Sequence, residues 1–319
     1  MLKKLLPTLA LSAVALMLPF ASAQAAYPEK PIHMIVPWAA GGGTDVVARA
    51  LAESMKKFTD VAVVVDNVTG AGGSTGNAKV AEAAPDGYTI LFNGDTDILG
   101  ALSVMKTPYT LDSFKYVGGV YYSPTWILSH KNRNISTMKE FIEKAKAEPN
   151  KLILGSTTPS GAQMVMCASI QAYTKAPFRI VPYQGGKDMT KALLGDQCDA
   201  GIIHAPMLLP EVKSGVLTVI GTGGSLANCT YEPLRSMKTL TEEGIPVEMG
   251  INRGVLVPAG TPDDIVQKLT EIVKSATESK EFIEFGERFG FAPLWTPGDA
   301  YKEGFIKQMK TFEQAKASM

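Results

Sequence analysis

The chain has 319 residues, 45% of them hydrophobic, and its 31 lysines and arginines balance its 31 aspartates and glutamates. This balance leaves no electrostatic footprint for nucleic acid or an anionic membrane surface. The cysteines and histidines lack the spacing of a zinc site, so we expect no metal and no other cofactor. Whether two of Cys167, Cys198 and Cys229 form a disulfide is left open by their spacing.

Residues 1–25 have the pattern of a secretory signal peptide. Lys3 and Lys4 precede an apolar run over residues 5–20, and small residues follow it. The run is shorter than the roughly 20 apolar residues that a membrane helix needs, and the small residues suit cleavage after Ala23 or Ala25. We therefore expect an exported mature protein that is not embedded in a membrane.

Short apolar strands alternate with helical patterns along the rest of the chain. The first set predicts strands at residues 32–36, 61–65 and 88–92, with helices at 44–58 and from 77 to 84. The second set predicts strands at 125–129, 152–155, 179–182 and 200–203, with helices at 137–147, 162–173 and 187–195. A strand at 255–257 and helices at 263–279 and 301–317 complete the chain.

This alternation predicts an α/β fold with mostly parallel sheets built from crossover units. The length and the restart of the pattern predict two lobes. We assign residues 26–123 plus 249–319 to lobe 1 and residues 124–248 to lobe 2. The chain then crosses between the lobes twice, and the terminal helices return to cover lobe 1.

Three loops at strand ends are suited to an anionic ligand, at residues 38–45, 69–77 and 156–163. Ligands of open α/β sheets bind beyond the carboxyl ends of strands, where glycine admits the backbone and helix N-termini offer free N–H groups. The alternative is a set of capped turns with nothing bound. In that case Asp45 caps or braces its loop, and the hydroxyls of the third loop bond their own backbone.

Residues 72–76 match the G-x-S-x-G pattern of a hydrolase nucleophile elbow, which would make Ser74 a nucleophile. Such a hydrolase needs a histidine after its acid and late in the chain. The last histidine is His204, with more than a hundred residues still to come. We therefore expect no catalytic residues, and a serine hydrolase stays the enzyme alternative.

Side chains at later strand ends are candidates for the far end of a ligand. Arg253 has the planar fork that binds a carboxylate bidentately, and its alternative is an ion pair that bridges the lobes. His204, at the end of a predicted strand, is a ligand contact or a satisfied core or rim residue.

Four segments carry a family resemblance: YPEKPIHMIVPWAAGGGTDVVAR, VDNVTGAGGSTGNAKVAEAAPDGYTILF, VPYQGGKDMTKALLGDQCDAGI and RGVLVPAGTP. Their order and spacing resemble the tripartite tricarboxylate transporter substrate-binding family, the Bug or TctC-type periplasmic receptors. The chain departs from many relatives at Pro159, which stiffens the third loop, and at Asn252, where they have a tryptophan.

The resemblance implies a flytrap of two Rossmann-like lobes that close over a small carboxylate in a central cleft. The ligand would be a di- or tricarboxylate or a related organic acid, passed in the periplasm from a monomeric receptor to a tripartite tricarboxylate-type membrane permease. A ligand sensor that partners a signalling receptor is the alternative. The candidate ligand-binding residues are Trp38, Ala39, Gly42, Gly43, Thr44, Asp45, Gly72, Gly73, Asn93, Asp95, Thr96, Ser156, Thr157, Thr158, Ser160, Gly161, Gln163, Tyr183, His204 and Arg253.

Overall fold

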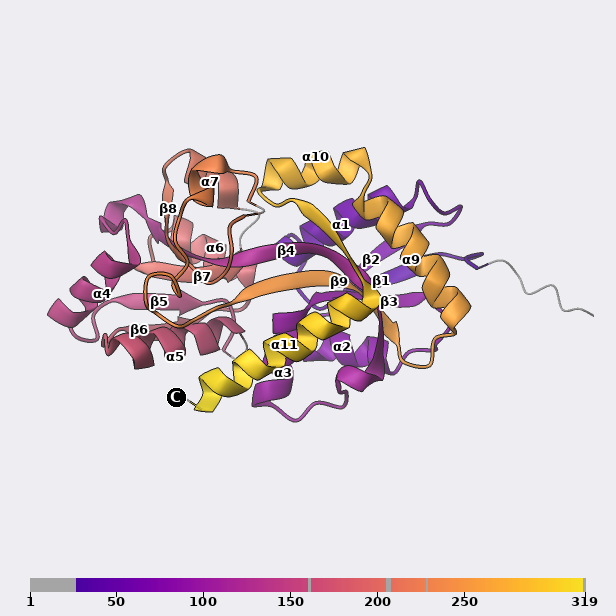
Figure 1. Cartoon of the computed structure of the whole chain (residues 1–319), viewed down its shortest axis with the longest axis horizontal. Helices are drawn as coiled ribbons and strands as arrows, with labels where there is room; N and C mark the ends of the chain where they lie inside the picture. Colours follow the sequence, from indigo (N-terminus) through magenta and orange to yellow (C-terminus); the bar gives the residue numbers. More distant parts are fainter. Residues whose placement is uncertain (1–26, 160–161, 205–207, 228, 318–319) are drawn as a thin grey trace, which may run out of the picture.

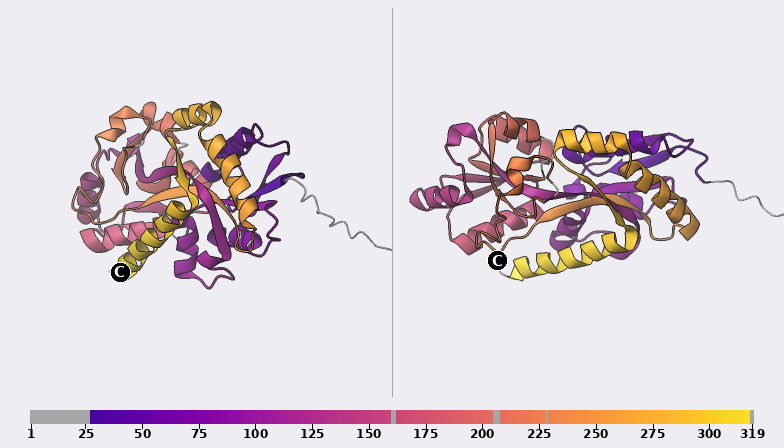
Figure 2. Two further views of the ribbon diagram at one scale, coloured as in Figure 1. Left: turned by 45° about the vertical axis from the view of Figure 1, so that its right-hand side comes forward. Right: turned by 45° about the horizontal axis from the view of Figure 1, so that its top comes forward.

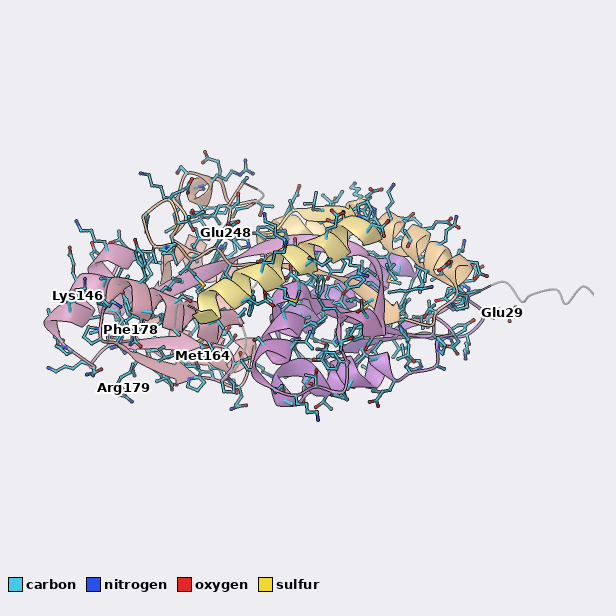
Figure 3. All side chains as sticks on the ribbon, turned by 60° about the horizontal axis from the view of Figure 1, so that its bottom comes forward. Glu29, Lys146, Met164, Phe178, Arg179 and Glu248 are labelled. Atoms are coloured by element: carbon cyan, nitrogen blue, oxygen red, sulfur yellow. The ribbon has the colours of Figure 1, made fainter. Side chains whose placement is uncertain are left out.

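A computed structural model describes residues 27–159, 162–204, 208–227 and 229–317 (Figure 1). The expected signal peptide, Ser160 and Gly161 lie outside the described residues. The molecule is elongated, and Figure 3 places Glu29 at one end of its long axis and Lys146 at the other. The two ends belong to two groups of strands and helices that meet near the middle.

The strands and the first two helices of the first group follow the predicted order, and the helix over residues 95–104 was not predicted. The elements of this group are β1 (Ile32–Val36), α1 (Gly43–Met55), β2 (Val63–Asn67), η1 (Ala71–Gly73), α2 (Ser74–Ala81), β3 (Thr89–Gly94), α3 (Asp95–Val104) and η2 (Leu111–Ser113). The long strand β4 (Phe114–His130) then leads out of this group.

The second group contains η3 (Lys131–Arg133), α4 (Met138–Ala147), β5 (Ile153–Ser156), α5 (Ala162–Thr174), β6 (Arg179–Pro182), α6 (Gly186–Leu194), β7 (Ala200–His204), α7 (Leu209–Lys213), β8 (Leu217–Thr222) and α8 (Glu232–Arg235). The chain returns through β9 (Gly250–Pro258) and ends with α9 (Asp263–Thr277), α10 (Lys280–Phe289), β10 (Pro293–Pro297) and α11 (Gly298–Ala317).

Parallel strands form the outer part of each group. In the first, β1 lies between β2 and β3 and is parallel to both; in the second, β5 lies between β6 and β7 and is parallel to both. The antiparallel strand β4 joins them, because its first part pairs with β9 up to Pro124 and its second part pairs with β7 and β8 from Thr125 or Trp126 onward. The predicted α/β fold with two lobes is confirmed.

Buried helix faces hold the first lobe together. Val47, Leu51 and Met55 recur every four residues along α1 and are at most 1% exposed. They share one apolar core with β1 and with the buried face of α9. Full burial of such a side chain contributes about 1.5–3 kcal/mol, so this stripe holds α1 against β1.

The last helix, α11, extends from the first lobe toward the second (Figures 1 and 2). Near its start, Phe305 packs edge-on against Tyr116 of β4, with ring centroids 5.1 Å apart. Further along, Phe312 belongs to the same apolar cluster as Met166 of α5. Helix α11 therefore packs against β4 and also reaches α5 of the second group.

Two further properties bear on the sequence-based expectations. Cys167, Cys198 and Cys229 are all buried, and each is a free thiol. In the described part of the chain, none of the helices combines the length and apolar character required to cross a membrane.

Candidate functional site

A cleft of about 440 Å³ lies where the carboxyl ends of the parallel strands of both lobes meet. It is lined by Pro37, Trp38, Ala39, Gly42, Gly43, Thr44, Thr69, Gly70, Ala71, Gly72, Gly73, Asp97, Thr157, Thr158, Pro159, Gln163, Tyr183, Gln184, Gly185, Gly186, Lys187, Ile203, His204 and Arg253. The lobes approach closely across it, because a Cβ placed on Gly41 would lie 4.0 Å from Nζ of Lys187.

The loop between β1 and α1 presents the start of a helix to the cleft. Gly42 is the N-cap of α1 in an extended conformation, and no side chain caps the helix. The first N–H groups of a helix have no partner within it, so those of Gly43 and Thr44 are placed to donate to an anion. The partial positive charge of the helix N-terminus adds to this attraction.

Asp45 stabilises this loop from behind and does not line the cleft. Its carboxylate accepts hydrogen bonds from the backbone N–H of Gly41 at 2.8 Å, from Nε of Arg49 at 3.1 Å and from Nδ2 of Asn67 at 2.9 Å. Burial opposes its ionisation, but these hydrogen bonds outweigh burial and lower the pKa of Asp45. Asp45 is thus an ionised brace of the loop.

The second glycine loop packs against Trp38. Gly73 has a φ of +92°, and a Cβ there would lie 3.2 Å from the indole ring of Trp38. The indole Nε1 donates to Oδ1 of Asn93 at 3.0 Å, and Asn93 in turn donates to Oδ1 of Asn77 at 2.9 Å. Asn93 therefore orients the ring from behind and is fully buried.

In lobe 2, the loop after β5 is tied to the loop before α6. Oγ of Ser156 donates to the carbonyl of Thr158 at 2.8 Å, and the N–H of Gly185 donates to the carbonyl of Thr157 at 2.7 Å. Gly185, with a φ of +103°, is the N-cap of α6. A second helix N-terminus therefore faces the cleft from the opposite lobe, next to the exposed Lys187.

Three buried residues of the lining, Asp97, His204 and Arg253, form what we call the floor of the cleft, and two of them form an ion pair. Arg253 of β9 donates through Nη2 to Oδ2 of Asp97 at 3.0 Å and through Nη1 to the hydroxyl of Tyr121 at 3.0 Å. Close packing makes room for the arginine, because a Cβ on Gly94 would lie 3.1 Å from its Cγ. Burial lowers the pKa of Arg253, but Tyr121 and Asp97 more than compensate, so the guanidinium stays charged.

His204 lies at the end of β7 and on the same floor. Its Nδ1 is 3.1 Å from the hydroxyl of Thr125, and the side chain is buried. Burial, reinforced by the charge of Arg253, lowers the pKa of His204 well below 6.5. The imidazole is neutral at physiological pH.

Asp95 and Thr96 begin α3 and lie behind the lining. Asp95 accepts from the backbone N–H of Asn252 at 3.0 Å and from its Nδ2 at 2.7 Å, so it ties α3 to β9. Burial outweighs these hydrogen bonds and raises the pKa of Asp95 to about 6.

Most of the candidate residues come together in the cleft. Those that line it are Trp38, Ala39, Gly42, Gly43, Thr44, Gly72, Gly73, Thr157, Thr158, Gln163, Tyr183, His204 and Arg253. Asp45, Asn93, Asp95, Thr96 and Ser156 lie outside the lining. Two charged residues of the lining, Asp97 and Lys187, were not among the residues predicted from the sequence to bind a ligand. Each follows a predicted strand by only a few residues, and this position could have indicated them.

The chain is similar in sequence to a known receptor family. A family model described as tripartite tricarboxylate transporter family receptor matches residues 47–314. Protein BugT of Bordetella pertussis is 30% identical over 284 residues, which is 88% of this chain and 86% of BugT.

Solved structures show the same architecture. The periplasmic binding protein BugD superposes with a TM-score of 0.80 at 31% identity, over 92% of this chain and 98% of BugD. MatC of Rhodopseudomonas palustris with bound malate has a TM-score of 0.80 at 23% identity, over 91% of this chain and 99% of MatC, and shows the shared fold.

Proposed function

The chain belongs to the tripartite tricarboxylate transporter receptor family, and on that premise we propose that it captures a small carboxylate in the cleft and delivers it to a membrane permease. One observation carries the proposal: the N-termini of α1 and α6 face one cleft from opposite lobes. Each of these helices has a glycine at its N-cap and no side-chain cap. Their N–H groups suit carboxylate oxygens. MatC, a protein of the same fold, holds malate.

Closure needs no chemistry. Contacts that exist only when both lobes surround the ligand shift the population toward the closed form. We place the lobe boundaries at residues 26–123 plus 249–319 and 124–248. The change of β4 from pairing with β9 at Pro124 to pairing with β7 at Thr125 supports this division.

The proposed site of action is the periplasm, reached through the signal peptide, and the proposed acting form is a monomer. A ligand sensor would share the cleft and differ only in its membrane partner. Two findings would favour delivery over sensing. One is a permease gene beside the gene for this receptor, and the other is loss of uptake of the acid when the receptor gene is deleted. We propose no enzymatic activity for the chain.

The serine hydrolase alternative has no support from the contacts of the described residues. Ser74 is 6% exposed at the start of α2. The side chains of His33, His130 and His204 contact Asp66, Asp196 and Thr125, respectively, and none is a hydrogen-bond partner of Ser74. A nucleophile needs a base within hydrogen-bond reach.

A thermal-shift screen of protein purified from the periplasmic fraction tests the proposal. The panel contains mono-, di- and tricarboxylates, amino acids and aromatic acids. A ligand at about 100 times its Kd adds roughly 2.7 kcal/mol to the free energy of unfolding, so at least one carboxylate should raise Tm clearly. X-ray scattering should then show a smaller radius of gyration with that acid. No response to any acid would overturn the proposal.

A further inference from the structure

Two nitrogen atoms at the floor of the cleft have no hydrogen-bond partner among the described residues: Nε of Arg253 and Nε2 of His204. Both side chains line the cleft, and they are only 5% and 8% exposed. An unpaired buried polar atom is costly, and most such atoms in folded proteins have a partner. Both nitrogens are enclosed in this conformation, but their side chains line the cleft, so a ligand group that reaches the floor becomes their partner once these side chains shift to admit it.

The charge of the floor is already balanced. The guanidinium of Arg253 is paired with the carboxylate of Asp97, and its remaining Nη atom donates to Tyr121. His204 is neutral, as its burial and the nearby arginine dictate. The positive charge left over in the cleft lies elsewhere, at Lys187 and at the helix N-termini.

Building on the proposed function, we propose that this floor is a subsite for an uncharged oxygen-bearing group: a hydroxyl, a ketone or an amide. The favoured ligand is then a monocarboxylate whose acid group lies at the helix N-termini and whose far end carries that neutral group. This assignment differs from the expectation that Arg253 holds a second carboxylate.

Three kinds of far end can be compared at this floor. A hydroxyl or amide group accepts from Nε of Arg253 through its oxygen and can form a second hydrogen bond with Nε2 of His204. A methyl group leaves both nitrogens unpaired. A second carboxylate accepts from Nε of Arg253, and from Nε2 of His204 in the tautomer that carries the proton there, but it adds a buried negative charge next to Asp97, which already neutralises the arginine.

Matched acids test the assignment on the wild-type protein by isothermal titration calorimetry. Each set keeps one carbon skeleton and changes only the far end: butyrate, 4-hydroxybutyrate, succinamate and succinate, their five- and six-carbon homologues, and the corresponding para-substituted benzoates. We expect a hydroxyl or amide acid of one skeleton to bind at least ten times more tightly than both its methyl and its dicarboxylate counterparts.

The outcomes separate the two proposals. If a dicarboxylate is the tightest ligand of its skeleton throughout, the neutral subsite is wrong and carboxylate capture stands. If the methyl acids bind as well as the hydroxyl and amide acids, the floor makes no polar contact and the subsite is also wrong. If no acid of these sets or of the wider panel binds, both proposals fail.

Asp97→Asn sharpens the test, because it removes the charge that opposes a second carboxylate. In this variant the dicarboxylate should gain at least tenfold relative to the amide acid of the same skeleton. Asp199→Asn, in the ion-pair network of lobe 2, is the matched control and should leave that ratio unchanged. An unchanged ratio in folded Asp97→Asn contradicts the assignment; if the variant does not fold, the wild-type series decides alone.

Discussion

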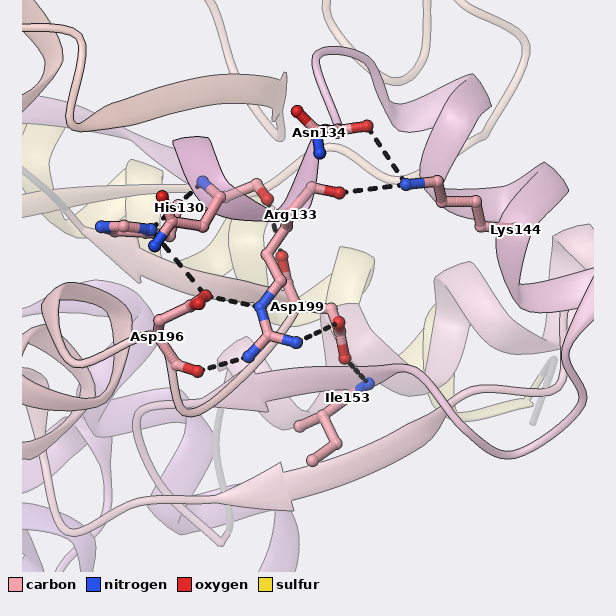
Figure 4. Close-up of polar contacts among 9 residues, drawn as sticks. His130, Arg133, Asn134, Lys144, Ile153, Asp196 and Asp199 are labelled. Atoms are coloured by element: carbon pink, nitrogen blue, oxygen red, sulfur yellow. Dashed lines mark hydrogen bonds and ion pairs between the residues drawn. The ribbon is translucent and has the colours of Figure 1, made fainter.

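Arg133 in lobe 2 and Arg253 at the cleft are both held by aspartates, but they differ in what remains free. Arg133 donates through Nε to Oδ1 of Asp196 at 2.5 Å, through Nη1 to Oδ1 of Asp199 at 3.0 Å, and through Nη2 to the carbonyl of Asp196 (Figure 4). Asp199 also accepts from the N–H of Ile153 at 2.7 Å. Every nitrogen of that guanidinium has a protein partner.

Arg253 has protein partners for both Nη atoms and none, among the described residues, for Nε. The comparison separates an ion pair whose hydrogen-bond donors are all used within the protein from one that, under the proposal, also serves a ligand. A saturated network joins the segments at the far end of lobe 2 and has nothing left to offer a ligand. Under the proposal, the unpaired Nε of Arg253 is the donor that a molecule in the cleft uses.

The largest expected effect comes from Arg253→Ala, which leaves the carboxylate of Asp97 buried and unpaired. Loss of one partner of a buried pair costs about 3–5 kcal/mol of the free energy of unfolding. Urea unfolding at neutral pH measures this loss. The double variant Arg253→Met with Asp97→Leu should recover most of the stability without recovering ligand affinity; a double variant that still binds the best acid of the panel would remove Arg253 from the site.

The second prediction concerns Asp95, whose pKa of about 6 lies above the value of 3.8 for a free side chain. A carboxyl whose pKa is raised by folding binds more protons in the folded state, so its stabilising contribution at low pH is lost as pH rises from about 4 to about 6. At 1.36 kcal/mol per pKa unit, the loss is about 3 kcal/mol.

The wild type should therefore lose up to this amount relative to Asp95→Asn when unfolding free energies at pH 4 and pH 7 are compared. The amide introduced by this substitution keeps an oxygen that can accept from the backbone N–H of Asn252, so that contact is common to both proteins. Equal pH dependence in the two proteins would show that Asp95 is not perturbed in this way.

The third prediction tests the saturated network. Arg133→Ala removes charged hydrogen bonds to Asp196 and Asp199, and such bonds contribute about 1.5–3 kcal/mol each when buried. The side chains of Arg133 and Asp196 are each 31% exposed, so water compensates in part and we expect a total loss of about 1–3 kcal/mol. Calorimetry should show unchanged affinity for the best acid, and a changed affinity would end the distinction between the two arginines.

Local sequence signals predicted much of the fold. Strand β6 begins and ends where expected, and α4, α5 and α6 were placed to within one residue at each end. These units are bounded by glycine, proline or capping residues, which act over a few positions.

The long strand β4 was predicted only over residues 125–129. Its first part contains Gly118 and Gly119, which interrupt a strand pattern. The structure explains one of them, because a Cβ on Gly118 would collide with the ring of Trp295 in β10. A strand that is specified by packing against a residue so distant in sequence leaves no local pattern, and β10 itself was missed for the same reason.

The glycine loops of the site were predictable from composition and position, but the floor was not. Helix α3 was not expected, so Asp97 had no assigned place. Its partner Arg253 stands 156 residues later, and the sequence left open whether that arginine binds a carboxylate or bridges the lobes. The structure gives an ion pair with both partners in lobe 1 under the proposed boundaries, and the ligand contacts themselves stay a proposal.

The smallest expected effect on stability comes from Lys187, the exposed lysine at the opposite side of the cleft from the buried pair. Lys187→Met should change the free energy of unfolding by less than about 0.5 kcal/mol, as is usual for surface substitutions. Binding should respond more, because the uncompensated charge of the cleft is then carried by the helix N-termini alone. An exposed charge acts through water and is screened at physiological salt.

Titrations of wild type and Lys187→Met at low and high salt can therefore separate the two cations. The affinity of the wild type for the best acid should fall as salt rises, whereas that of the variant should fall less, and the two should converge at high salt. The contribution of Arg253 is shielded from solvent and should persist there. If the variants at Lys187 and Arg253 showed the same salt dependence, the buried arginine would be acting as a general attractor of anions, and its open Nε would not distinguish it from a surface charge.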